Sequence, residues 1–161
     1  MRVYLPATLP GLVRARTSGV LDGEHACAVT PAVREWYTDD DIEQLEFAVL
    51  VDAAQASLDL LEADPDAPRR RLVVAADVPD QQVGTGEGAH RSSVRLARPV
   101  PLSSVVSLHI DEPEAQDVVA AAVAALAAAR AGDEDAEFDV SETEGCDLLW
   151  YDITELDDLI G

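Results

Sequence analysis

The chain has 161 residues with 32 acidic and 11 basic side chains, which gives a formal net charge of −21, and all 11 basic residues are arginine. The absence of lysine excludes a Walker-type phosphate loop and an internal Schiff base, because both need a lysine amine. A field this negative repels phosphate backbones and anionic lipids, so we expect neither direct nucleic-acid binding nor membrane binding.

A chain of this length normally forms one domain around one core, so residues 1–161 are predicted to form a single α/β domain. Its acidity is uneven. Residues 1–110 carry 16 acidic and 10 basic side chains, whereas residues 111–161 carry 16 acidic side chains and only Arg130. The last third is therefore strongly acidic, and its surface is where a charge-attracted partner is expected to bind.

Short apolar runs with strand character occur throughout the chain. Strands are predicted at residues 3–5, 25–29, 72–76, 93–97, 105–111, 136–140 and 148–151. The run 72–76 has no polar residue, which is typical of a central strand covered on both faces. The run 136–140 alternates apolar and acidic residues, which is typical of a half-exposed strand.

Helical patterns separate these strands. Helices are predicted at 9–18, 31–37, 42–63, 113–131 and 153–160. Thr8 and Thr30 are predicted N-caps, residues 38–41 cap the long third helix, and Gly132 follows the alanine-rich fourth helix. The third helix has two apolar rows, one of which begins at Phe47, so much of its circumference should be covered.

Strands interleaved with helices predict an α/β fold with a mixed sheet of about five to seven strands and three main helices. We expect parallel pairing where a helix connects two strands, and antiparallel pairing among the later strands. The strand order is not readable from the sequence.

Two segments resemble ligand-binding motifs. Residues 84–89 match the glycine spacing of a dinucleotide-binding turn, but Pro79 separates them from the preceding strand and no helix follows, so a surface loop over 79–91 is favoured. The spacing of calcium ligands in an EF-hand loop is matched by Asp133, Asp135, Glu137 and Glu144. Because Phe138 stands where that loop needs glycine, a solvated acidic strand or loop is favoured, and we expect no metal or cofactor.

An active site in an open α/β sheet would lie at strand ends and in the loops that follow them. The candidate catalytic residues on this basis are Asp77, His90, Arg91 and Asp111. The simpler interpretation is that these are strand-end, cap and loop residues. Cys27 is predicted to pack inside a strand, and the carboxylates near Cys146 should raise its pKa, so neither cysteine is expected to be a reactive thiol.

The dipeptides Trp36-Tyr37 and Trp150-Tyr151 contain both tryptophans and two of the three tyrosines. Such rings either pack in the core with a polar tip at the surface or anchor a binding partner. Core packing is the simpler interpretation, and an exposed ring would indicate an interface.

Five blocks follow one another along the chain: MRVYLPA at 1–7, AVTP at 28–31, REWY at 34–37, VVAAD at 73–77 and LLWY at 148–151. Together, in this order, they resemble a family of short uncharacterised actinobacterial proteins. The resemblance spans nearly the whole chain and implies a cytoplasmic bacterial protein without an assigned activity. The two cysteines and the lack of an export signal pattern also favour the cytoplasm.

These observations favour a non-enzymatic protein that binds a basic protein partner or a second copy of itself, because catalytic signatures are missing and an acidic surface steers basic partners. Two alternatives stay open. One is a small hydrolase-like enzyme with a site near Asp77 and the 79–91 loop, and the other is an acidic mimic of nucleic acid. The acidity also fits salt adaptation or a biased genome composition.

Overall fold

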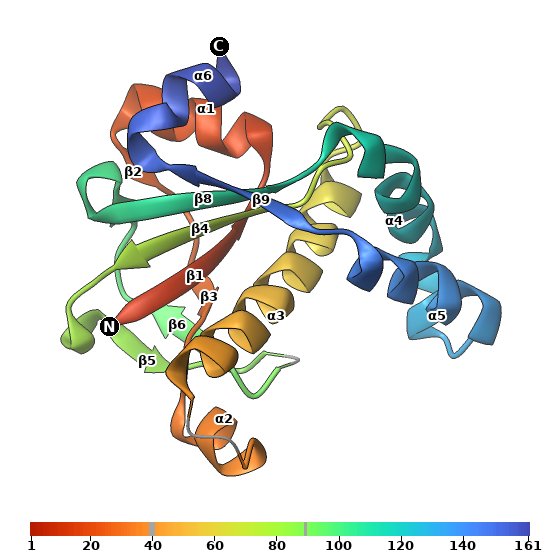
Figure 1. The fold of residues 1–161 in the computed structure, drawn as a ribbon, viewed down its shortest axis with the longest axis horizontal. Helices are drawn as coiled ribbons and strands as arrows, with labels where there is room; N and C mark the ends of the chain where they lie inside the picture. Colours follow the sequence, from red (N-terminus) through yellow and green to blue (C-terminus); the bar gives the residue numbers. More distant parts are fainter. Residues whose placement is uncertain (39–40, 89) are drawn as a thin grey trace.

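A seven-stranded sheet forms the centre of the computed structural model, which describes residues 1–38, 41–88 and 90–161 (Figure 1). In spatial order the strands are β5 (Val83–Thr85), β6 (Ser93–Leu96), β3 (His25–Cys27), β1 (Arg2–Ala7), β4 (Leu72–Asp77), β8 (Val105–Asp111) and β9 (Leu148–Asp152). A separate two-stranded ladder joins β2 (Val20–Leu21) to β7 (Val100–Pro101). The first strand of the chain thus lies near the middle of the sheet, and the last strand forms one edge.

The prediction of a partly parallel sheet is wrong, because every described pair of neighbouring strands is antiparallel. One connection still follows the rule that two strands joined by a helix run in the same direction. β3 and β4 run in the same direction, as the long helix between them requires, but β1 lies between them and runs the opposite way. Insertion of the first strand between two later strands therefore makes both pairings antiparallel.

Helices cover both faces of this sheet (Figure 1). In chain order they are α1 (Leu9–Ser18), α2 (Pro31–Trp36), α3 (Ile42–Ala63), α4 (Gln116–Arg130), α5 (Glu134–Ser141) and α6 (Leu156–Ile160). α1 and α6 pack on one face, and α3 crosses the other face against β1, β3 and β4. α4 packs on the C-terminal half of α3, α5 packs on α4, and the apolar cluster that they form is separate from the sheet core. The short 3₁₀ turns are η1 (Asp80–Gln82), η2 (Leu102–Ser104), η3 (Pro113–Ala115), η4 (Glu142–Gly145) and η5 (Ile153–Glu155).

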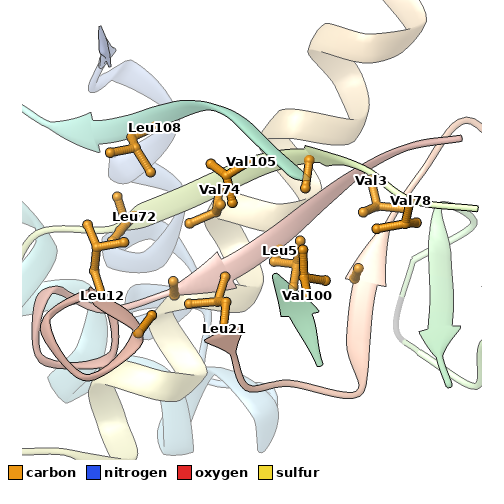
Figure 2. Packing of buried hydrophobic residues seen from close by; sticks show 14 of the residues in the cluster. Val3, Leu5, Leu12, Leu21, Leu72, Val74, Val78, Val100, Val105 and Leu108 are labelled. Carbon is orange, nitrogen blue, oxygen red and sulfur yellow. The ribbon is translucent and has the colours of Figure 1, made fainter. Parts of the chain in front are cut away.

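Two apolar clusters lie on the two faces because successive side chains of a strand point in opposite directions. On the α1 face, Leu5 and Val74 pack with Leu12 of α1 (Figure 2). On the α3 face, Val73 packs with Val49 of α3. β4 contributes fully buried residues to both clusters, which confirms the prediction of a central strand over 72–76.

The helix caps follow the sequence closely. Thr8 Oγ1 accepts a hydrogen bond from Gly11 N at 3.2 Å, and Thr30 Oγ1 accepts one from Val33 N at 3.2 Å. The long helix α3 is capped by the Asp41 carboxylate, which accepts from the Glu43 amide. The predicted cap also included residues 39–40, which lie outside the described residues.

The strand predicted at 136–140 is wrong, because these residues belong to helix α5. Asp133 caps this helix by accepting from Ala136 N at 3.1 Å. Ala136 and Val140 are four residues apart on one side of the helix: Ala136 is buried and Val140 packs against the cluster of α3 and α4, whereas Phe138 is exposed. The apolar alternation over five residues thus contains a helical i, i+4 pair.

The segment 79–91 is not a plain loop, because it contains β5, which forms a hairpin with the following strand β6. A Cβ atom at Gly86 would lie 2.7 Å from the backbone of Ser93, so close packing of the hairpin requires glycine there. This contact explains a glycine of the 84–89 pattern without a phosphate ligand; Ala89 lies outside the described residues.

Candidate functional site

A buried ion pair joins the start of β4 to the end of β8. The Asp111 carboxylate accepts from Arg71 Nε at 2.9 Å and from Nη2 at 2.8 Å, and also from the Arg71 backbone N at 2.7 Å. The side chains are only 5% (Arg71) and 0% (Asp111) exposed. Arg71 Nη2 also donates to the carbonyl oxygen of Cys146 at 3.2 Å, so the pair holds the segment that leads into β9.

A pocket of about 220 Å³ lies beside this ion pair, between α3 and the segment 143–148; we call it the β9 pocket. Its lining residues are Phe47, Leu50, Val51, Ala54, Arg71, Thr143, Glu144, Cys146, Asp147 and Leu148. The walls are therefore mainly apolar, with a buried guanidinium and two carboxylates as the charged groups.

The Nη1 group of Arg71, with its two N–H donors, makes no hydrogen bond to the described residues. Nε and Nη2 are bonded as described. No fully shielded side-chain nitrogen of the described residues lacks a partner, so Nη1 keeps some solvent exposure, and Arg71 lines the pocket. A group that fills the pocket without accepting this hydrogen bond would leave the donor unpaired, at a cost of about 1–3 kcal/mol.

Two exposed aromatic rings belong to the elements that form the β9 pocket, and one of them, Phe47, lines it. Phe47 on α3 is 66% exposed, and Trp150 on β9 is 60% exposed. Trp150 lies two residues beyond Leu148, so both side chains are on the same face of β9. Core packing is therefore wrong for Trp150, whereas Tyr151 points to the opposite face and packs, partly buried, against the α1-side core.

His109 is the cross-strand neighbour of Trp150. Its Nε2 lies 3.0 Å from Ser107 Oγ, and burial lowers the pKa of the imidazole. A lowered pKa favours the neutral ring at pH 7, so this pair adds a polar but uncharged element next to Trp150.

A second group of residues gathers on the other side of helix α3, between α2, α3 and the segment that leads into β6. The Arg91 guanidinium carbon lies 3.6 Å from the centre of the Trp36 ring, and His90 Nδ1 lies 3.4 Å from Asp52 Oδ1. These residues and Tyr37 line a pocket of about 170 Å³. Trp36 and Tyr37 are both exposed, so core packing is wrong for this dipeptide too.

The four candidate catalytic residues occupy three separate places. His90 and Arg91 are adjacent, as described. Asp77 ends β4 at the far side from Asp111 and forms an exposed ion pair with Arg2, with Nε 2.6 Å from Oδ1. The hydrogen bonds from Arg2 hold the pKa of Asp77 below its usual value, which makes this carboxylate a weak base. The structure thus assembles no shared site from all four.

The calcium-ligand pattern is not realised as a loop. Asp133 is the cap of α5, Asp135 and Glu137 lie within that helix, and Glu144 lies in η4 beside the β9 pocket. Among residues 1–38, 41–88 and 90–161, no group of three or more histidine, cysteine or carboxylate side chains is arranged to hold a metal ion.

A family model matches residues 1–160 of the chain. The chain belongs to DUF6912, a family of unknown function. This result confirms the resemblance to an uncharacterised family. No curated protein and no solved structure matches the chain. Within the described residues, no helix of this DUF6912 protein is long and apolar enough to cross a membrane.

Both cysteines of this DUF6912 chain are free thiols. Burial raises the pKa of Cys27 to about 11. Burial is also the main reason that the pKa of Cys146 is raised, and nearby carboxylates, including Asp111, add to the effect. Neither thiol is therefore activated at neutral pH, although Cys146 lines the β9 pocket.

Sequence reasoning missed Phe47 and Arg71 as members of a site in this DUF6912 protein. Phe47 belongs to an apolar row of α3, but the N-terminal half of that helix is covered on one side only, which leaves the ring in solvent. Arg71 directly precedes a fully apolar strand, and this position was the available signal that the arginine is buried. Its partner could not be read from the sequence, because the register of β4 with β8 brings them together.

Proposed function

We propose that this protein binds another polypeptide at the β9 pocket. The observation that carries the proposal is a pair of exposed rings at a pocket with apolar walls: Phe47 lines the pocket, and Trp150 lies on the same face of β9 as the lining residue Leu148. Contiguous exposed apolar surface marks interaction sites, and tryptophan is enriched among the residues that dominate binding energy. A polypeptide would cover both rings and the pocket, whereas a small ligand inside the pocket would leave Trp150 in water.

The charge around the pocket supports a basic partner. Glu144 and Asp147 line it, and residues 111–161 carry 16 acidic side chains with Arg130 as the only basic residue. Arg130 is already paired with Asp59 and Glu62 of α3. Negative potential of this kind steers a basic partner toward the surface and raises its association rate.

We infer that the protein acts in the cytoplasm of an actinobacterium. Both cysteines are free thiols, which suits a reducing compartment, and the family resemblance points to such organisms. A hydrolase-like activity near Asp77 and the 79–91 loop has less support, because Asp77 is separated from His90 and Arg91 and is held in an ion pair.

The proposal can be tested with a display library of random 12-residue peptides selected on the immobilised protein. Affinities of selected peptides are measured by fluorescence anisotropy for the wild type and for Phe47→Ala, Trp150→Ala and Trp36→Ala. We expect each of the first two substitutions to weaken binding by at least about tenfold, since hot-spot aromatic residues contribute more than about 1.4 kcal/mol.

Trp36→Ala is the matched control, because Trp36 is also 60% exposed but lies at the other pocket. It should leave the affinities unchanged. Failure to enrich any peptide would contradict the proposal, as would an equal loss of affinity in the Trp36→Ala protein.

A further inference from the structure

Hydrogen bonding shows which backbone groups of β9 face away from the sheet. The Asp111 amide donates to the Arg71 carbonyl at 3.1 Å, so the backbone of Asp111 is bonded toward β4. Asp111 lies opposite Leu148 in the ladder between β8 and β9. In an antiparallel ladder, inward and outward groups alternate, so the N–H and C=O groups of Leu148 and Trp150 point outward, away from β8.

The same alternation applies to Asp152, and its amide confirms the assignment. This N–H donates to Glu155 Oε2 at 2.8 Å, outside the sheet. Nothing equivalent serves the amides of Leu148 and Trp150 among the described residues, because β9 is the terminal strand and pairs only with β8. Two unpaired N–H groups and their neighbouring carbonyls thus form an open edge beside the β9 pocket.

This edge lacks the features that usually protect an edge strand. Native proteins block such edges with lysine, proline, a bulge or a very short strand. β9 has five residues, LLWYD, without lysine or proline, and its register with β8 is unbroken. The opposite edge differs, because β5 has three residues and contains Gly84. Of the two edges, β9 is therefore the one suited to accept another strand.

Charge decides between a second copy and a different polypeptide. Asp147 and Asp152 lie at the two ends of β9, and Glu144 lies at the pocket beside it. Antiparallel pairing of two β9 strands would bring Asp152 of one copy close to Asp147 of the other. Like charges placed opposite one another on neighbouring strands are destabilising, whereas lysine or arginine at these positions would be attracted.

We propose that the partner is an extended basic segment that adds to the sheet as a strand beside β9. The proposal rests on the proposed function, because it specifies how a polypeptide occupies the same site. Main-chain bonds to Leu148 and Trp150 would supply affinity, and alternate side chains of the added strand would contact Trp150 and the β9 pocket. Its basic side chains would meet Glu144, Asp147 and Asp152.

Amide hydrogen exchange followed by NMR tests this arrangement, with peptides from the display selection as probes. In the free protein the amides of Leu148 and Trp150 should exchange quickly and those of Leu149 and Tyr151 slowly. The selected peptides should be rich in lysine or arginine, and saturation with them should slow exchange at Leu148 and Trp150 by at least about tenfold. Peptides that bind the pocket without this protection would overturn strand addition and leave the proposed function intact.

Two substitutions at position 150 distinguish the contribution of the main-chain N–H to binding from that of the side chain. Trp150→Pro removes the outward N–H, and no bond to β8 is lost because that N–H faces away from it. Trp150→Ala removes the ring and keeps the N–H. We expect the proline variant to bind at least about tenfold more weakly than the alanine variant, with both showing the wild-type fold by circular dichroism. Equal affinities would overturn strand addition.

If the proline variant does not fold, main-chain pairing can be tested by modifying the peptide in place of the protein. N-methylation at alternate residues of a selected peptide should abolish binding for one set of positions and spare the other set, as a paired strand requires. If the peptide still binds after N-methylation of either set of positions, the proposal is overturned. Sedimentation of the peptide-free protein as a dimer that Trp150→Ala dissociates would replace the basic segment by a second copy.

Discussion

At the scale of one residue, Asp111 shows that a carboxylate at the end of a strand can have a structural role and not a catalytic one. The sequence offered two roles for it, a catalytic acid or a cap for the following helix. Instead, both of its carboxylate oxygens accept hydrogen bonds from Arg71, and Glu112 takes the N-terminal position of the 3₁₀ turn η3. The pairing spans 40 residues of sequence, and only the register of β4 with β8 creates it.

We expect Asp111→Asn to lower the free energy of unfolding by about 3–5 kcal/mol, because removing one partner of a buried ion pair leaves an uncompensated charge in the core. Urea unfolding followed by circular dichroism measures the change. Asp77→Asn breaks the exposed pair with Arg2 and is the matched control, with an expected loss below about 1 kcal/mol. Similar losses of unfolding free energy in both variants would show that burial of the Arg71 charge does not depend on its pairing with Asp111.

At the scale of elements, local signals predicted most helices and strands. Threonine caps, Gly132 and the uncharged run 72–76 each act within a few residues, and the structure has them as expected. Helix α5 was missed because its alternation of apolar residues spans only five positions. Over that length a strand and a helix both bring apolar residues to one side, and packing on α4 decides between them.

The cap of α5 offers a test of that element. Asp133→Ala removes the side chain that accepts from the Ala136 amide, and we expect a loss of about 0.5–2 kcal/mol in the free energy of unfolding. Chemical denaturation gives the value. Asp139→Ala changes the same charge later in the helix, where the side chain caps none of the described residues, and should cost less. If both variants lost the same stability, the cap would not be what holds α5.

At the scale of the whole molecule, neither the strand order nor the β9 pocket could be predicted. Both depend on β1 inserting between β3 and β4 and on β9 ending at an edge, which are relations between segments far apart in sequence. The exposed tryptophans show the same limit. Trp36 follows Arg34 and Glu35, whereas Trp150 follows two leucines, and only the assembled fold shows that both rings are 60% exposed.

The net charge of −21 should oppose folding through self-repulsion. We expect the unfolding temperature to rise by several degrees between low salt and about 1 M sodium chloride, because a gain of 1 kcal/mol shifts it by about 2–4 °C for a chain of this size. Differential scanning calorimetry provides the measurement, and a glycerol solution with the same osmolality as the salt solution provides the control. An unchanged temperature in salt would mean that the acidic side chains are too far apart to repel one another.

The central position of β1 has a consequence for synthesis on the ribosome. β1 comprises residues 2–7, and its longest partner, β4, begins only at residue 72. At about 5–20 residues per second, the nascent chain spends roughly 3–13 s with its first strand made and that partner absent. During this interval the mostly apolar β1 is a natural substrate for the chaperones that meet nascent chains. The last strand to emerge, β9, has no such delay, because β8 is complete before it is made.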